Sequence, residues 1–367
     1  MKKPLGIYIH IPFCVRKCKY CDFLSGPADE KTQRAYVEML LKEIEKYGEL
    51  LKTRQTDTIF FGGGTPSALP GGEIARIMEK IRSFGNVSEH AEISIEANPG
   101  TVTEEKLLQW KKAGINRISF GLQSADNEEL KKLGRIHSWE AFLENYQLAR
   151  KCGFDNLNVD LMSALPGQTV EIWKKTMEKV VSLEPEHISA YSLIIEEGTP
   201  FYEAYADHPE LLPTEEEERE MYYETKTVLG KHGYERYEIS NYAKPGYECR
   251  HNLSYWERTD YLGLGLGAAS LLGNVRKSNQ TELREYLEGN FEGEREVLSE
   301  ENAMEEYFFL GLRKMKGVDW MPYKEQYTKV VEKLVTEGLL RKENEYIRLT
   351  ELGIDVSNYV LSEFLVE

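Results

Sequence analysis

The sequence of 367 residues has few cysteines, no long apolar run and a deficit of basic residues. Five cysteines are too few, and odd in number, for a secreted fold held by disulfides, so we expect free thiols in a reducing, cytoplasmic compartment. The apolar stretch from Leu5 to Phe13 contains His10 and Pro12, which argues against a signal peptide or a transmembrane segment. A net charge of -16, with no basic stripe to offset it, disfavours nucleic acid as a partner.

The first two hundred residues instead alternate between short β-rich runs and amphipathic helical runs. Helical spacing is visible from Val37 to Tyr47, from Thr103 to Ala113 and from Thr169 to Leu183. The predicted strands are Gly6 to Ile11, Thr58 to Phe61, Glu92 to Ala97, Ile115 to Phe120, Leu157 to Leu161 and Ile188 to Leu193. Because parallel strands need helical crossovers, the pattern predicts an α/β fold, a full or partial (βα)6 barrel with its site at the strands' carboxyl ends.

The run Cys14-Val-Arg-Lys-Cys18-Lys-Tyr-Cys21 places three cysteines within eight residues. Three thiolates so spaced can hold three irons of a [4Fe-4S] cluster and leave the fourth iron open, whereas clusters that only transfer electrons usually have four cysteines. A zinc site needs a fourth Cys or His, and neither His10 nor Cys152 supplies a recognisable partner. Buried structural cysteines are the other alternative, although basic residues separate these three.

Glycine and polar residues follow the predicted strands at their carboxyl ends. Gly62 to Ser67 contains three successive glycines, which would let backbone donors approach a small polar ligand; a tight turn is the alternative. Arg135 offers a guanidinium to a carboxylate, although a lone arginine is by default a solvated surface residue. Five more polar residues follow the predicted strands, and each could simply cap a helix. Together they are expected on one rim of the barrel, at the carboxyl ends of the strands, and they are Glu96, Asn98, Gln123, Ser124 and Asp160.

The cysteine motif resembles that of the radical S-adenosylmethionine (SAM) enzymes. In that family SAM chelates the open iron, and an electron from the cluster cleaves SAM to methionine and a 5'-deoxyadenosyl radical. The chain further resembles the anaerobic coproporphyrinogen III oxidase group over nearly its whole length, in the motifs Gly62 to Ser67, Glu96 to Pro99, Phe120 to Ser124, Gly134 to His137 and Asp160 to Gln168. This resemblance implies that Cys14, Cys18 and Cys21 bind the cluster, and that the SAM site is lined by Tyr8, Tyr20, Gly64, Thr65, Glu96, Gln123, Arg135, Asp160 and Ile194.

In two features the chain differs from the oxidases and resembles the HemW-type haem chaperone branch of that group. The oxidases have a further cysteine where this chain has Phe23, and they have a longer segment before the motif. The branch also has a second signature, present here from Cys249 to Trp256. Its His251 is the candidate haem ligand, with Tyr255 and Trp256 available to a porphyrin face, although a lone histidine is more often structural. Cys249 is a rival haem contact or a buried free thiol.

The rest of the chain is expected to be accessory structure. A capping box at Thr214 and Glu217 begins a helix that ends near Lys231, and the residues from Glu301 resemble a winged helix with a hairpin from Leu340 to Leu349. Its acidic residues favour packing or partner docking over DNA binding. We therefore expect a radical SAM partial barrel over 1–205, a connecting and haem-motif region over 206–290, and a mostly helical domain over 291–367.

The resulting hypothesis is a haem chaperone that binds a [4Fe-4S] cluster, SAM and haem, and delivers haem to a respiratory acceptor protein. An electron donor is implied if SAM is cleaved, and no catalytic residue is assigned. The principal alternative is an oxygen-independent oxidase that decarboxylates coproporphyrinogen III through the deoxyadenosyl radical. A third alternative is a SAM-binding scaffold without redox chemistry.

Overall fold

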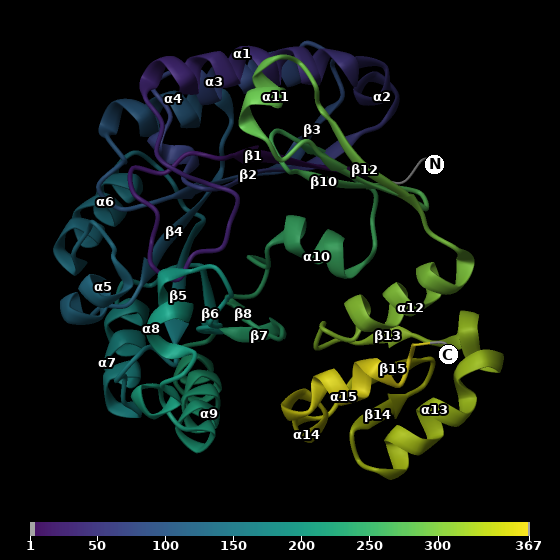
Figure 1. The fold of residues 1–367 in the computed structure, drawn as a ribbon. Helices are drawn as coiled ribbons and strands as arrows, with labels where there is room; N and C mark the ends of the chain where they lie inside the picture. The colour runs from purple at the N-terminus through teal and green to yellow at the C-terminus, as the bar shows by residue number, and fades with distance from the viewer. Residues whose placement is uncertain (1–3, 366–367) are drawn as a thin grey trace.

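The computed structural model describes residues 4–365, which form a large parallel-centred sheet and a small second domain (Figure 1). Six strands lie side by side in sequence order and run parallel: β1 (Leu5–Ile11), β2 (Thr56–Gly63), β3 (Val87–Ala97), β4 (Arg117–Gln123), β5 (Leu157–Ser163) and β6 (His187–Ser192). This confirms the predicted partial (βα)6 barrel, with each predicted strand found within a few residues of its expected place.

Helices cover the convex face of this curved sheet (Figure 1). They are α1 (Glu30–Lys46), α2 (Gly48–Thr53), α3 (Glu73–Arg82), α4 (Glu104–Ala113), α5 (Asn127–Leu133), α6 (Trp139–Lys151) and α7 (Val170–Val181), whereas α8 (Pro200–Tyr205) donates the Phe201 backbone N–H to the Lys19 carbonyl oxygen. In α1, Val37, Leu40 and Ile44 share one face and are fully buried against the strands. Side chains on the other face of each strand therefore point into the barrel, where the candidate site lies.

Additional strands extend both edges of the sheet. At one edge, β9 (Tyr261–Leu264) pairs in parallel with β1 and continues into the antiparallel strands β10 (Ala269–Leu272), β11 (Val275–Asn279) and β12 (Glu292–Val297). At the other edge, β8 (Asn241–Ala243) pairs with β6 and β7 (Glu235–Glu238). Gly263 allows close packing here, because a Cβ would lie 2.0 Å from the Ala269 carbonyl oxygen. The glycine-rich run after Tyr261 therefore allows close backbone packing and does not form a phosphate-binding loop.

The region between the barrel and the second domain also supplies helices. The predicted capping box at Thr214 and Glu217 is confirmed at the start of α9 (Glu215–Lys231). A short helix, α10 (Arg250–Trp256), carries His251 and lies inside the curve of the sheet, and α11 (Leu283–Leu287) lies outside it (Figure 1). Short 3-10 turns occur at Pro66–Ala68, Pro209–Leu211 and Met321–Tyr323.

The second domain has its own core and its own three-stranded sheet. It contains α12 (Glu300–Gly311), β13 (Val318–Asp319), α13 (Lys324–Thr336), β14 (Leu340–Glu343), β15 (Tyr346–Leu349), α14 (Glu351–Asp355) and α15 (Ser357–Ser362). Phe308, Trp320 and Ile347 are among its buried residues. The hairpin predicted from Leu340 to Leu349 is present. β12 belongs to the large sheet although it follows residue 290, where the connecting region was expected to end.

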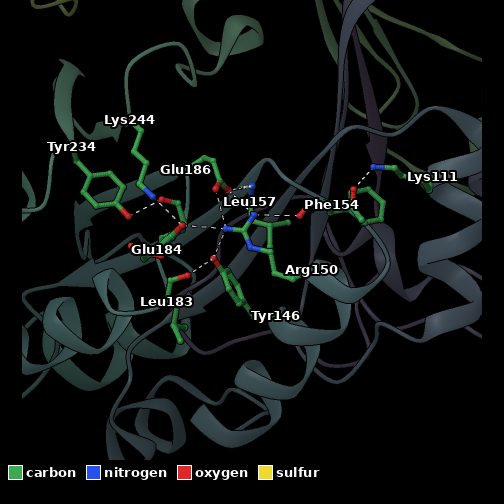
Figure 2. A network of polar contacts seen from close by, with 12 residues as sticks. Lys111, Tyr146, Arg150, Phe154, Leu157, Leu183, Glu184, Glu186, Tyr234 and Lys244 are labelled. Atoms are coloured by element: carbon green, nitrogen blue, oxygen red, sulfur yellow. Dashed lines mark hydrogen bonds and ion pairs between the residues drawn. The ribbon is translucent and has the colours of Figure 1, made fainter.

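A polar network closes the amino ends of β5 and β6, opposite the candidate site (Figure 2). Arg150 on α6 donates to the Tyr146 hydroxyl at 2.8 Å and forms an ion pair with Glu186 at 2.9 Å. Glu186 in turn accepts from the backbone N–H of Leu157 at 3.0 Å. Because ligands bind at the carboxyl ends of such strands, we assign this network to stability. None of the helices in the described part of the chain has the length and apolar character needed to cross a membrane.

Candidate functional site

The carboxyl ends of β2 to β6 and the cysteine-containing loop enclose an outer cavity of about 450 Å³. All three motif cysteines and every predicted SAM residue except Tyr8 line it. These residues are Cys14, Cys18, Cys21, Tyr20, Gly64, Thr65, Glu96, Gln123, Arg135, Asp160 and Ile194. Parallel strands bring their carboxyl ends to one edge of a sheet, which explains why residues so far apart in sequence meet here.

The cysteine loop follows β1 and lies against Gly64, the residue directly after β2. Cys14 donates its backbone N–H to Gly26 at 3.0 Å, and Cys21 donates to Cys18 at 3.3 Å. A Cβ on Gly64 would lie 2.8 Å from the Phe13 carbonyl oxygen and 3.0 Å from the Cys14 sulfur. The glycine at position 64 therefore lets the cysteine loop approach, a structural reason that the sequence reading had not included.

The three thiols are half-buried and free, and they share the outer cavity. Burial, with smaller contributions from Cys18 and Cys14, raises the pKa of the Cys21 thiol. Thr65 Oγ1 lies 3.6 Å from Cys14 Sγ, and an Arg135 nitrogen lies 3.5 Å from Cys18 Sγ. Among residues 4–365 no three metal-ligating side chains converge as a preformed ion site. Three thiols with hydrogen-bond donors directed at two of them fit an iron–sulfur cluster.

Two carboxyl groups form the floor of the outer cavity. Glu96 accepts from the Gly63 backbone N–H at 3.1 Å, and Asp160 accepts from Ser119 at 3.0 Å and from Asn158 at 2.7 Å. Burial, and secondarily the Asp160 charge, raises the pKa of Glu96 to about 8. Burial also raises the pKa of Asp160. A protonated Glu96 and a hydrogen-bonded Asp160 can bind hydroxyl or ammonium groups of a ligand.

Arg135 lies deeper and closer to the cysteines than its sequence context suggested. Only 9% of the residue is exposed, and its guanidinium donates to Asn98 Oδ1 at 2.6 Å and to the Gly121 carbonyl oxygen. The reading of a solvated surface arginine is therefore wrong. Its place on the cavity wall leaves it able to meet a carboxylate beside Cys18.

Gln123 ends β4 in a left-handed backbone conformation, with φ of 75°, where the pairing with β5 shifts register. Its side-chain oxygen accepts from Tyr191 at 2.9 Å. Such a conformation in a buried non-glycine residue is typical of a functional site. Ser124, by contrast, donates to Glu129 at 2.5 Å and does not line the cavity.

Sequence reasoning missed several residues that line the outer cavity. Ser189 and Tyr191 project from β6, Ser119 from β4, and Asn241 and Asn252 from the region after α9. Alternation along β6 was the available signal, because Ile188 faces the core and its neighbours must face the barrel interior. No comparable signal marked Asn241 or Asn252.

Replacing Glu96 with Gln should change how stability depends on pH. The ordinary pKa of 4.5 applies to the unfolded chain and about 8 to the folded chain, so between these values only the unfolded state ionises. The wild-type free energy of unfolding should therefore fall as pH rises through this window, by about 2 to 4 kcal/mol relative to Glu96→Gln. Urea unfolding of both proteins at pH 4.5 and pH 8 measures this difference. If the free energy of unfolding depends on pH in the same way in the wild type and in Glu96→Gln, the raised pKa of Glu96 is contradicted.

Tyr8 and His251 line a second, inner cavity of about 220 Å³, nearer the amino ends of the strands. Five residues line both cavities, so the two spaces adjoin, and these are Glu96, Ser119, Asp160, Ser189 and Asn252. Arg117 also lines the inner cavity; it is 2% exposed, and its Nε has no hydrogen-bond partner within the described chain. The haem motif thus lies beside the predicted SAM residues Glu96 and Asp160, although about ninety or more residues of sequence separate them from it.

Glu92 anchors the helix that carries His251. Its carboxylate accepts the backbone N–H of Arg250 at 2.9 Å and that of His251 at 3.1 Å, at the amino end of α10. Cys249 donates its thiol to the same carboxylate at 3.5 Å. Burial raises the pKa of Cys249 to about 12, so it is a buried neutral thiol, the default reading of that residue.

The imidazole of His251 is 1% exposed and both ring nitrogens have partners. Nδ1 lies 2.9 Å from Thr58 Oγ1, and Nε2 lies 2.9 Å from the Tyr255 hydroxyl. Phe60 stacks on the ring at 5.2 Å. Burial, and secondarily the charge of Arg117, lowers the pKa of His251 to about 3. The ring is neutral at physiological pH, and binding to iron requires Tyr255 or Thr58 to release a nitrogen.

Trp256 does not line either cavity. Its ring lies under the guanidinium of Arg313, 4.5 Å from the ring centroid, and so joins α10 to the segment after α12. Of the two aromatic residues in the motif, Tyr255 is therefore the one placed beside His251.

Comparisons with known proteins agree with this geometry. The model of the Radical SAM superfamily matches residues 8–180, and that of the HemN C-terminal domain matches residues 298–356. The chain is 38% identical to heme chaperone HemW of Bacillus subtilis, covering 98% of this chain and 99% of the relative. It is 35% identical to heme chaperone HemW of Lactococcus lactis, covering 100% and 99%. The solved structure of coproporphyrinogen III oxidase (HemN) from Escherichia coli superposes with a TM-score of 0.84 at 25% identity, covering 99% of this chain and 90% of that one.

Proposed function

The chain belongs to the HemW heme chaperones of the radical SAM superfamily, and on this premise we propose that it binds haem and delivers it to an acceptor protein. The observation that carries the proposal is the similarity to these chaperones over essentially the full length of both chains. It includes the second domain and the region around His251, and so it extends beyond the barrel that other radical SAM proteins share.

Cys14, Cys18 and Cys21 would hold a [4Fe-4S] cluster, and the outer cavity beside them would hold SAM. The cluster, when bound, supplies an open iron and an electron. Arg135 is suited to the SAM carboxylate, since its guanidinium lies beside Cys18. Glu96 and Asp160 are suited to hydroxyl groups, since both carboxyls line the same cavity. Gly64, Thr65, Tyr20, Gln123 and Ile194 would shape the remaining walls, and Tyr8 would act from the inner cavity.

His251 would provide the nitrogen ligand to haem iron. Its low pKa keeps the ring neutral, as an iron ligand must be. Its two hydrogen bonds mean that haem binding is coupled to a local rearrangement around Tyr255 or Thr58. The acceptor would be a respiratory haem protein, the chaperone would act in the cytoplasm, and an electron donor would reduce the cluster if SAM is cleaved.

The oxidase is the second candidate function, because its structure superposes on nearly the whole chain. Phe23 distinguishes the chaperone from the oxidase, since the oxidases resemble this chain but have a cysteine at the position of Phe23. The test is anaerobic incubation of the reconstituted protein with coproporphyrinogen III, SAM and a reductant. We expect no vinyl product under conditions in which a genuine oxidase decarboxylates the substrate. Multiple turnovers would overturn the chaperone proposal.

Substituting Arg135 with Gln, or Asp160 with Asn, should weaken SAM binding without removing the cluster. Each change removes one charge-assisted contact, so the Kd for SAM should rise about tenfold, measured by calorimetry on anaerobically reconstituted protein. Arg284→Gln is the matched control, because 86% of that side chain is exposed and it lies outside both cavities. Unchanged SAM affinity in both variants, at full cluster content, would remove these residues from the SAM site.

A further inference from the structure

Exposed apolar side chains lie at the outer cavity and at a small pocket that adjoins it. Phe23 is 59% exposed and Ile194 is 68% exposed, and both line that cavity. Val15 at 58% and Ile136 at 49% line a small adjoining pocket with Cys18. We call these four residues the apolar rim. Large apolar side chains scattered singly are ordinary on protein surfaces, but a group around one cavity mouth marks a binding surface.

Basic residues accompany the apolar rim. Arg16, Lys17 and Lys19 are exposed on the cysteine loop, and no acidic residue occurs between Cys14 and Cys21 in a chain of net charge -16. One Arg16 nitrogen donates to the Gly134 carbonyl at 2.6 Å, and Lys17 donates to the Phe23 carbonyl at 2.9 Å. Both cations keep further N–H donors for a ligand. Asp22 directly follows Cys21 and lines a small pocket together with Lys17 and Glu197, and Glu196 lines the outer cavity, so the cationic run ends at Cys21.

His251 cannot be the first residue that an arriving haem meets. It is 1% exposed, enclosed by Phe60, Tyr255 and Thr58, and its cavity of about 220 Å³ is too small for a tetrapyrrole. Haem entering from solvent therefore needs an accessible surface on which to bind before the region around His251 rearranges. That surface must accept a flat apolar face and two carboxylates.

We propose that haem docks first on the apolar rim, with a porphyrin face against Phe23 and its propionates at Arg16, Lys17 and Lys19, before His251 ligates its iron. This inference rests on the proposed chaperone function and adds the entry site. The docked haem lies over the mouth of the outer cavity, which adjoins the inner cavity that His251 lines. Ligation then transfers the hydrogen-bonded nitrogen of His251 from its hydroxyl partner to iron, with no change in redox state.

The test is stopped-flow haem binding, followed by absorbance, with the anaerobically reconstituted protein. An entry site controls the association rate and not the affinity of the final complex, so Phe23→Ser should lower the association rate constant about tenfold, with Phe23→Leu restoring most of it. The final spectrum should equal that of the wild type because His251 is intact. The double variant Lys17→Gln and Lys19→Gln should slow association and reduce its dependence on salt. Leu352→Ser, at an exposed apolar residue of the second domain, is the matched control.

Ile136→Ser supplies a variant outside the cysteine loop, in case Phe23→Ser lowers cluster content, and it should slow haem association in the same direction. Unchanged association rates in the Phe23, Ile136 and lysine variants would overturn the rim proposal. Unchanged association rates with slower transfer to apomyoglobin would also overturn it, because the rim would then be an acceptor-docking face. If the wild type itself binds no haem, the chaperone function fails before the rim is tested.

Discussion

Cys18→Ser is expected to abolish both the cluster and the binding of SAM. Cys18 is one of only three thiols that line the outer cavity, so its loss leaves two ligands for a cluster that already lacks a fourth cysteine. After anaerobic reconstitution the variant should contain almost no iron or acid-labile sulfide. SAM, which needs the open iron, should bind at least about a hundredfold more weakly than to the wild type.

Cys152→Ser is the matched control for that experiment. Cys152 is a free, half-buried cysteine that lies on the end of α6 and lines neither cavity. It should keep full iron content and full SAM affinity. A Cys18→Ser protein that folds, lacks iron and still binds SAM normally would support the scaffold alternative.

His251→Ala should remove the iron ligand, and Tyr255→Phe should have the opposite effect. Without the imidazole the Soret band of the haem complex should shift, and haem affinity should fall at least about tenfold. Tyr255→Phe keeps the aromatic ring but removes the hydroxyl that lies 2.9 Å from Nε2. The freed nitrogen should bind iron more readily, so affinity should rise about two- to tenfold.

The pH dependence of haem binding provides a second readout for His251. Burial lowers its pKa to about 3, so the folded protein holds a neutral ring throughout the range from pH 6 to pH 9. Proton competition for the nitrogen should be absent there, and the wild-type Kd should stay constant between pH 6 and pH 7, below the pKa of about 8 of Glu96 in the same cavity. A tenfold weakening on acidification to pH 6, or equal haem spectra for wild type and His251→Ala, would exclude this histidine as the ligand.

The central sheet was predictable because its strands alternate with helices of clear apolar periodicity. The ranges from Gly6 to Ile11 and from Leu157 to Leu161 lie within β1 and β5. Strand order follows from the parallel crossovers, and strand order alone brings Glu96 and Asp160 to one edge. The spacing of the three cysteines predicted that the loop after the first strand belongs to the same site. These local patterns account for the outer cavity.

The inner cavity was not predictable in this way. It exists because α10 inserts into the curve of the sheet, and that insertion depends on Glu92 accepting the N–H groups of Arg250 and His251. No local pattern pairs a β3 carboxylate with a helix about 160 residues later. The burial of His251 inside the curve of the sheet depends on that long-range contact.

The role of the glycine run could be predicted from the sequence only in part. The run from Gly62 to Gly64 was expected to serve a ligand, and Gly64 does line the outer cavity. The structure adds that Gly63, with φ of 109°, lies against the ring of His10, and that Gly64 lies against Phe13 and Cys14. Sequence alone cannot show which neighbour requires the missing side chain, because the neighbour comes from another strand.

The most direct test of the chaperone account is a haem titration of the anaerobically reconstituted wild-type protein beside His251→Ala. The account predicts saturable binding of one haem per chain by the wild type, with a nitrogen-ligated spectrum that the variant lacks. Absence of saturable haem binding by a wild-type protein with full cluster content would contradict it.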